Sequence, residues 1–235
     1  MTLDDVMADL HAHGSEQTKK TFARHGAREP FYGVKVEHLK TIVKRVKTDH
    51  PLALALYDTG NSDAMYLAAY LCDPAVMTKA QLNKWVKAAY WHMLSCYAVA
   101  WAAAESRFGR ELALAWMDSP KEQVAAAGWS TYAGLLSITP DEELDHDEIV
   151  GLLERIESDI VTAPNRVKYV MNGFVIAAGS YVPALTAKAK ATAKAVGRVT
   201  VDVGDTDCKV PDAAAYIDKV IAAGRQGKKR KTVMC

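Results

Sequence analysis

Apolar side chains recur along most of the chain at intervals of three and four residues, which is the spacing of amphipathic helices. Between residues 36 and 46, the apolar positions are Val36, Leu39, Ile42, Val43 and Val46, and polar or charged side chains fill the rest. This spacing places the five apolar side chains on one face. The pattern therefore predicts a helix over residues 36–46 with one buried face.

Start and stop signals divide the chain into many such helices. Thr78-Lys-Ala-Gln81 and Ser119-Pro-Lys-Glu122 both match the capping box, and Pro120 stands where a first-turn proline is tolerated. Together with the stop signals, these sequences predict roughly a dozen helices, most of about 9 to 16 residues, joined by short connections. The stop signals that follow apolar runs are Gly14, Gly60, Asp73-Pro74 and Gly224.

One segment departs from the helical pattern. Residues 199–203, with the sequence VTVDV, alternate between apolar and polar side chains as a strand does. We therefore predict one short extended or hairpin segment near residues 199–207. The rest of the chain, which is rich in alanine, favours an all-α fold. Successive antiparallel helices close into a bundle or stack as pairs into a superhelix, so we expect one helical domain over 1–224 and a basic tail over 225–235.

The chain is nearly neutral, with 29 basic against 28 acidic residues, but its charges are segregated. Residues 1–50 carry 9 basic and 7 acidic side chains, residues 51–150 carry 6 and 13, and residues 151–235 carry 14 and 8. A protein with opposed patches can hold a polyanion on one face, so the balanced total does not exclude nucleic acid as a partner. It does exclude a protein that is basic over its whole surface.

Several other classes of protein are not expected. A hydrophobic share of 50% excludes intrinsic disorder. No apolar run is long enough to predict a membrane span, and the acidic, amphipathic N-terminus does not resemble a signal peptide. The four scattered cysteines (Cys72, Cys96, Cys208 and Cys235) form no CxxC pair and no metal-ligand spacing. We expect reduced thiols, a cytoplasmic location, no metal and no cofactor.

Basic residues gather near both ends of the chain at spacings that suit phosphate binding. The first group lies on and just after an early helix, and Lys35 then opens the next helix, whose N-terminal amides favour an anion. The run at 225–231, with five basic residues in seven, is typical either of a solvated tail or of a phosphate-binding segment. The predicted phosphate contacts are Lys19, Lys20, Arg24, Arg28, Lys35, Arg166, Lys168, Lys228, Lys229, Arg230 and Lys231.

Aromatic and nucleophilic side chains cluster in the segment 85–97, and further aromatics follow near 129–132 and 169–174. Such rings are usually core residues, but several of them around a concave surface would let bases or ribose stack. His92 has no carboxylate or second histidine at metal-ligand spacing, which favours a structural histidine. Cys96 and Ser95 are either small buried groups or, with a base nearby in space, nucleophiles.

Three segments stand in a distinctive order: GSEQTKK at 14–20, GAREPFYGV at 26–34 with Leu39-Lys40 after it, and LYDTGNSDAMYLAA at 56–69. This order resembles that of the DNA alkylation repair family of AlkD-like proteins. The resemblance covers most of the chain, as far as the basic run at 227–231. It depends on order and spacing rather than on one specific motif.

The resemblance implies an all-helical superhelix of HEAT-like helix pairs whose concave, basic face holds duplex DNA. Active members of the family excise cationic N3- or N7-alkylated purines without flipping the base. They use an aspartate and flanking tryptophans to stabilise the positive charge that develops on the sugar as the base departs. A carboxylate close to such an oxocarbenium-like centre lowers the barrier electrostatically.

Position by position, the resemblance keeps aromatic residues and loses charged ones. The family's Trp-Asp-x-x-Asp segment falls on His92-Met-Leu-Ser-Cys96, which puts Cys96, or Ser95 if the register slips by one, at the essential acid. A family arginine falls near residues 129–132, where this chain has none. Because a neutral thiol or hydroxyl supplies no negative charge, the resemblance implies a member without ordinary glycosylase activity. The residues that fall on the family's base and sugar cradle are Trp91, His92, Trp129 and Phe174.

We therefore hypothesise a DNA-binding protein that recognises damaged, distorted or branched DNA on a concave basic face, nucleoid-associated if bacterial. One alternative is an active glycosylase for N3- or N7-alkylated purines. Another is a helical-repeat scaffold with a protein partner on the acidic middle segment, and the sign of the groove's potential separates it from DNA binding. A thiol or hydrolytic enzyme using Cys96 or Ser95 would need a base, such as His92, within hydrogen-bond reach.

Overall fold

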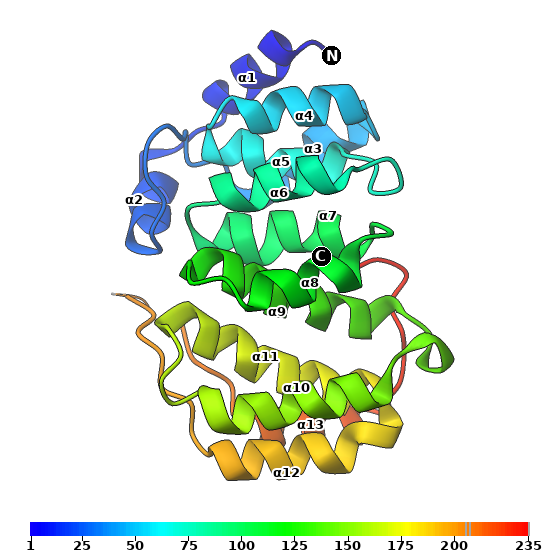
Figure 1. Ribbon diagram of the computed structural model, residues 1–235. Helices are drawn as coiled ribbons and strands as arrows, with labels where there is room; N and C mark the ends of the chain where they lie inside the picture. The colour runs from blue at the N-terminus through cyan, green and yellow to red at the C-terminus, as the bar shows by residue number, and fades with distance from the viewer. Residues whose placement is uncertain (205, 207, 235) are drawn as a thin grey trace.

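Helices follow one another along almost the whole chain and stack one above the next (Figure 1). The computed structural model describes residues 1–204, 206 and 208–234, and within them it has thirteen α-helices. A π-helix, η1 (Met93–Val99), leads into α7, and η2 (Asp141–Glu143) and η3 (Pro183–Leu185) are short 3₁₀-helices. The α-helices are α1 (Leu3–Ala12), α2 (Glu16–Arg24), α3 (Val36–Val46), α4 (His50–Asp58), α5 (Ser62–Leu71), α6 (Lys79–Ala88), α7 (Ala100–Ala104), α8 (Gly109–Met117), α9 (Glu122–Ile138), α10 (His146–Asp159), α11 (Asn165–Tyr181), α12 (Thr186–Val196) and α13 (Ala213–Ala222).

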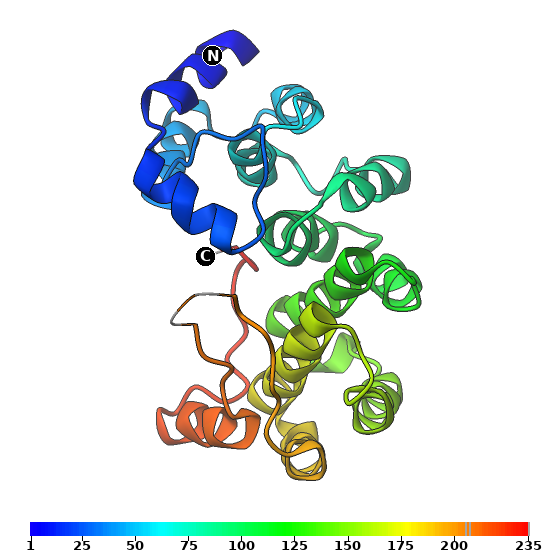
Figure 2. The same cartoon turned by 90° about the vertical axis from the view of Figure 1, so that its left-hand side faces the viewer.

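The helices form two curved layers, which Figure 2 shows nearly end-on. Helices α4, α6, α8, α10 and α12 make the outer, convex layer, whereas α5, η1 with α7, α9 and α11 make the inner layer. Helices α2 and α13 lie on the open side of the arc, toward its two ends. The predicted all-α superhelix of stacked helix pairs is confirmed, and its concave face belongs to the inner helices.

Side-chain caps determine where several helices begin. The capping box predicted at Thr78 is present: Thr78 Oγ1 accepts from Gln81 N–H at 3.2 Å, and Gln81 Oε1 accepts from Thr78 N–H at 2.8 Å. The box predicted at Ser119 does not form, because α9 begins at Glu122 and Ser119 Oγ accepts instead from Lys121 N–H. The same signature marks a helix start in both places but makes the full cap in only one.

Ion pairs link each outer helix to the next along the stack, and a further pair links α12 to α13. Exposed pairs of this kind stabilise a protein by at most about 1 kcal/mol each. Their main consequence is that acidic side chains of the convex layer are matched with basic ones. The pairs are Lys84–Asp58 between α6 and α4, Lys79–Glu111 between α6 and α8, Arg155–Asp118 between α10 and the end of α8, Lys188–Glu157 between α12 and α10, and Lys190–Asp218 between α12 and α13.

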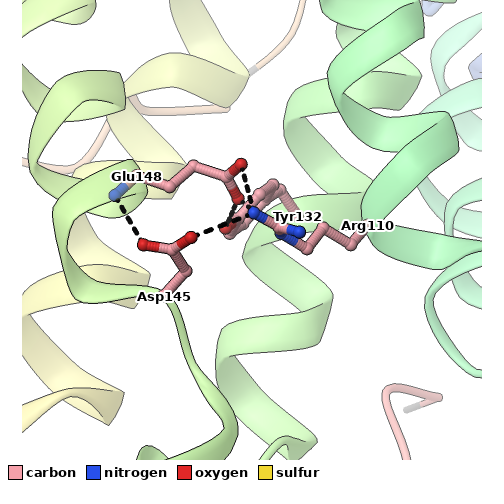
Figure 3. A network of polar contacts seen from close by, with 4 residues as sticks. All are labelled: Arg110, Tyr132, Asp145 and Glu148. Carbon is pink, nitrogen blue, oxygen red and sulfur yellow. Dashed lines mark hydrogen bonds and ion pairs between the residues drawn. The ribbon is translucent and has the colours of Figure 1, made fainter.

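A denser network ties α8, α9 and α10 together (Figure 3). Arg110 donates from Nε and Nη2 to the two carboxylate oxygens of Glu148, at 2.8 and 2.7 Å, and from Nη2 to Asp145 at 3.0 Å. The Tyr132 hydroxyl donates to the same Glu148 carboxylate. Burial, with the negative Glu148 beside it, raises the pKa of Tyr132, so its hydroxyl stays protonated. A bidentate pair with a third partner is stronger than an isolated surface pair.

Apolar side chains fill the space between the two layers. They form two clusters that follow one another along the stack, the first mainly from α1–α8 and the second mainly from α8–α13. Trp129 and Phe174 meet edge to face in the second cluster, with ring centroids 5.3 Å apart. Helices α8 and α9 approach closely at Gly128, where an added Cβ would lie 2.6 Å from Met117 N and 2.7 Å from Ala113 O.

Residues 199–204 form no strand, which corrects the predicted hairpin. A side chain takes the place of a neighbouring strand: Asn165 Nδ2 donates to Asp202 O at 2.7 Å, and Asp202 N–H donates to Asn165 Oδ1 at 2.8 Å. Burial still follows the alternation, because Val201 is buried whereas residues 200 and 202 are exposed. Asp205 and Asp207, which belong to the predicted hairpin, lie outside the described residues.

The basic C-terminal segment is not a solvated tail, because residues 225–234 return along the concave side of the inner layer (Figure 2). Val233 is only 4% exposed and belongs to the first hydrophobic cluster. The segment therefore connects the C-terminal end of the stack with its middle. The N–H groups of Gly227, Arg230 and Val233 donate to Ser180 O, Ser137 O and Glu105 Oε1, at 2.9, 2.7 and 2.9 Å.

Within the described residues, no single helix has both the length and the apolar character needed to cross a membrane. One bent pair, Asn165–Tyr181 with Pro183–Val196, meets those criteria by length and composition only, with a bend of 116°. Both of its helices contribute buried residues to the second hydrophobic cluster, including Phe174 and Ala189.

We predict that Gly128→Ala lowers the free energy of unfolding by about 1 to 3 kcal/mol, because the new methyl group would meet backbone atoms of α8. Gly151→Ala on α10 is the matched control. Nothing lies within 4 Å of a Cβ added there, so better helix propensity should raise stability by up to about 1 kcal/mol. Urea denaturation measures both changes. Equal stability of Gly128→Ala and wild type would contradict the close approach of α8 and α9.

Candidate nucleic-acid interface

A cavity of about 270 Å³, the central cavity, lies on the concave side over η1, α9 and α11. The C-terminal segment closes one of its sides. Small side chains recur along the face of α9 that borders it, which lets that segment approach the helix backbone. The residues lining the central cavity are His92, Cys96, Tyr97, Trp101, Ser130, Ala133, Gly134, Ser137, Arg166, Tyr169, Val170, Gly173, Tyr181, Arg230 and Val233.

Two further cavities continue the central cavity in opposite directions. The flanking cavity, of about 280 Å³, extends toward the end of α2 and shares His92 and Arg166 with the central cavity. The tyrosine cavity, of about 650 Å³, lies between α11, α13 and the C-terminal segment. The three together form one groove with walls from both ends of the chain. The residues shared by the tyrosine and central cavities are Tyr169, Gly173, Tyr181 and Arg230.

Positive charge in this groove is not matched by carboxylates in two of its three parts. The described residues that line the central and tyrosine cavities include no Asp or Glu. In the flanking cavity, Glu122 is engaged at the start of α11, where it accepts from Arg166 N–H at 2.6 Å. An uncompensated positive groove beside aromatic rings suits a polyanion. The cations that line the central and tyrosine cavities are Arg166, Arg225, Lys228 and Arg230.

The position that the resemblance assigns to a catalytic acid lies in the wall of the central cavity. Cys96 belongs to the π-helix η1, and such wide turns are rare and frequent at functional sites. Its Sγ atom lies 3.5 Å from Ser95 Oγ, which donates to Gln123 Oε1 at 2.8 Å. Burial raises the pKa of the Cys96 thiol. The side chain is therefore a neutral thiol at neutral pH and supplies no negative charge to the cavity.

His92 separates the central cavity from the flanking cavity and is half-buried. Its ring makes edge contacts with His25 and Trp91. Burial, followed by the positive charge of Arg166, lowers the pKa of His92 to about 3, so the imidazole is neutral at neutral pH. The Ser95 hydroxyl contacts Gln123 Oε1, Cys96 Sγ and the Trp91 carbonyl oxygen, and His92 is not among these partners. The hypothesis of a nucleophile activated by His92 is therefore without support.

Of the four residues predicted to cradle base and sugar, His92 alone is more than marginally exposed to the groove. Trp129 and Phe174 are fully buried, and Trp91 is 4% exposed with its indole N–H donated to Ser62 Oγ at 2.9 Å. The prediction is wrong for Trp129 and Phe174 because their rings fill the interior between α9 and α11. Neighbouring positions on the same two helices, with small or basic side chains, face the groove instead.

The predicted phosphate contacts divide into residues that line the groove and residues that do not. Two of the latter hold the structure together. Lys19 Nζ pairs with Glu29 at 2.8 Å, and Lys229 Nζ pairs with Asp141 at 2.8 Å and donates to Leu136 O at 2.9 Å. The predicted residues that line the groove are Arg24, Arg166, Lys228 and Arg230. Those at the surface elsewhere are Lys20, Arg28, Lys35, Lys231 and the partly exposed Lys168.

The sequence reasoning missed two tyrosines in the groove. Tyr181 ends α11 and Tyr216 lies on α13, and both line the tyrosine cavity together with Tyr169. Tyr216 is 47% exposed. Periodicity could have predicted the exposure of Tyr216, because this residue lies outside the apolar face of the amphipathic helix α13. Which other segments surround an exposed tyrosine is not encoded in local spacing.

One group of metal-ligating side chains occurs among the described residues, at the N-terminal end of the stack. The ligand atoms of Asp9, His13 and His38 lie within 4.8 Å of one another. Asp9 is already engaged, since its carboxylate binds Arg45 and lies 2.8 Å from His13 Nδ1. None of these residues lines the groove, and the expectation of no metal stays a prediction.

A helical superhelix with an electropositive concave groove defines a class of helical-repeat proteins suited to a polyanion. The chain belongs to the DNA alkylation repair enzyme family, whose model matches residues 6–200. It is similar to the uncharacterized proteins Lmo0209 of Listeria monocytogenes serovar 1/2a and Lin0241 of Listeria innocua serovar 6a. Each is 34% identical over 225 residues, which cover 93% of this chain and 97% of the relative.

A solved structure is also similar over 100% of both chains, with 37% identity and a TM-score of 0.91. It is described as belonging to a new family of proteins related to the HEAT-like repeat DNA glycosylases, with affinity for branched DNA structures. The agreement in fold extends over the whole helical stack. The chain is therefore similar to a HEAT-like repeat protein along its entire length.

We predict that Cys96 reacts slowly with iodoacetamide at pH 7. In a Cys208→Ser, Cys235→Ser variant, its modification should be at least about fivefold slower than that of free cysteine, because a raised pKa and restricted access both reduce thiolate attack. Mass spectrometry of the alkylated peptides measures the rate. Cys72, whose pKa burial raises to about 12, serves as the internal unreactive thiol. Modification of Cys96 as fast as free cysteine would contradict the neutral thiol.

Proposed function

We propose that this protein binds DNA along its concave groove and recognises branched or otherwise distorted structures without excising bases. The observation that carries the proposal is the groove itself. Cations and aromatic rings line its central and tyrosine cavities, with no Asp or Glu among their described lining residues. Membership of a DNA repair family and the similarity to a structure with affinity for branched DNA support the proposal.

Positive charge in a concave wall suits the phosphate backbone of DNA. Each cation that neutralises a phosphate releases counterions, so such binding weakens as the salt concentration rises. The Arg166 guanidinium stands over the Tyr169 ring, 5.0 Å from its centroid, which restrains the orientation of its donor group. Arg24 in the flanking cavity and Lys228 in the tyrosine cavity extend the same charge in both directions. The cations therefore suit a strand that runs along the groove.

The central and tyrosine cavities lack the negative charge that base excision needs, since no Asp or Glu is among their described lining residues. A departing base leaves positive charge on the sugar, and a nearby carboxylate stabilises it. At the family's acid position, burial raises the pKa of Cys96 and keeps the thiol neutral. Two carboxylates line the flanking cavity: Glu122 accepts from Arg166 N–H at 2.6 Å, and Asp202 accepts from Gly204 N–H at 2.8 Å. These features favour recognition of DNA structure over cleavage of a glycosidic bond.

We expect the double variant Arg166→Gln, Arg230→Gln to bind a four-way DNA junction about tenfold or more weakly than wild type at moderate salt. The slope of log affinity against log salt should fall by about 1 to 2, because two phosphate contacts are lost. Fluorescence anisotropy at several salt concentrations measures both quantities. The control is Lys84→Gln on the convex face, which should bind as wild type does. Equal weakening of groove variant and control would place DNA elsewhere.

We expect the wild-type protein to release no 7-methylguanine from alkylated duplex DNA beyond the spontaneous rate, because no carboxylate lines the central cavity, where the family's acid position lies. Chromatography of the released bases, with heat-denatured protein as the blank, measures this directly. Release that is lost in a Glu122→Gln variant would assign the missing carboxylate to Glu122 and establish excision.

A further inference from the structure

The tyrosine cavity has features that binding of a continuous duplex does not use. Three rings, those of Tyr169, Tyr181 and Tyr216, line one space of about 650 Å³. Cavities of this size enclose small ligands rather than extended surfaces. Tyr216 is 47% exposed and belongs to the small set of large hydrophobic side chains exposed in the described part of the chain. An exposed ring at the edge of such a cavity offers a stacking face.

The same walls carry positive charge that no neighbouring acid offsets. Arg225, Lys228 and Arg230 line the cavity, and its described lining residues include no carboxylate. Lys229, which lies between Lys228 and Arg230 in the sequence, does form an ion pair with a described acid, Asp141. Arg230 donates one bond to Met234 O at 3.0 Å, which leaves most of its N–H donors for a ligand. The cavity therefore combines aromatic faces with anion-binding groups.

The backbone holds these groups in place. Gly227 has a φ of +70°, which favours glycine, and its N–H donates to Ser180 O on α11 at 2.9 Å. A Cβ added at Gly227 would lie 2.8 Å from Pro183 Cγ, so the turn is seated against η3. The turn therefore fixes the position of Lys228, the residue that follows Gly227. The wall is thus a preformed part of the fold.

We propose that the tyrosine cavity holds an unpaired, single-stranded segment of branched DNA, with bases stacked on its tyrosines and phosphates bound by Arg225 and Lys228. This inference rests on the proposed function. In a duplex the faces of the bases are covered by their neighbours, so rings inside a cavity select nucleotides that have left the helix. The tyrosine cavity adjoins the central cavity, since Tyr169 and Tyr181 line both. A strand that leaves a duplex in the central cavity therefore has the tyrosine cavity beside it.

The test compares two fluorescent DNA probes that share one duplex, one blunt and one carrying a single-stranded thymidine flap. Full-length wild-type protein should bind the flap probe more tightly than the blunt probe. Tyr216→Ala should weaken binding of the flap probe by about five- to tenfold, the loss of one stacked base, and leave the blunt probe within twofold of wild type. Tyr216→Phe keeps the ring and should keep the flap affinity. A thermal melt confirms that each variant is folded.

The outcomes separate the two proposals. Wild-type protein that binds neither probe at low salt removes the proposed function and the inference with it. Equal binding of both probes by wild type overturns the inference alone, and so does an unchanged flap preference in Tyr216→Ala. Loss of the preference in Tyr216→Ala, with retention in Tyr216→Phe, supports a stacking role. Arg225→Gln should then reduce the salt slope for the flap probe and leave that for the blunt probe unchanged.

Discussion

Stacked helix pairs have no closed core, so each pair is stable only because it buries apolar surface against its neighbours. Because neighbouring helices lie against each other, their charged side chains also pair across the stack. On the outer layer, basic side chains of one helix meet acidic ones of the next, as Arg110 meets Asp145 and Glu148 (Figure 3). Much of the acidic excess of residues 51–150 is engaged in this way. A docking surface for a protein partner on that segment is correspondingly less favoured. Arg166, Arg225, Lys228 and Arg230, which line the groove, have no such acidic partner among the described residues.

The groove depends on chain segments that are far apart in sequence. Arg24 ends α2, Arg166 opens α11 and Arg230 belongs to the returning C-terminal segment, yet all three line adjoining cavities. The C-terminal segment has two roles there. It closes the central cavity by burying Val233, and it supplies the cations of the tyrosine cavity. The groove is thereby divided into a part suited to a phosphate backbone and a part suited to exposed bases.

Periodicity and capping predicted the architecture well, because burying one face of a helix leaves a direct mark on local sequence. The helix over 36–46 and the capping box at Thr78 are examples. The site was harder to predict, because a residue's type does not say which face of a buried helix it occupies. Trp129 and Phe174 were expected in a cradle and lie in the core, whereas Arg166, predicted as a phosphate contact, lines the groove. The extended or hairpin segment predicted near 199–207 forms no strand among its described residues, where the side chain of Asn165 exchanges two hydrogen bonds with the backbone of Asp202.

The central claim is that DNA occupies the concave groove, and hydrogen–deuterium exchange with and without a branched DNA tests it most directly. Amides that DNA covers or stabilises exchange more slowly. The account predicts protection of the first turns of α11 and of residues 225–234, together with unchanged exchange in the outer helices α4, α6 and α8. Protection confined to the outer helices, or none at a DNA concentration that saturates binding, would contradict it.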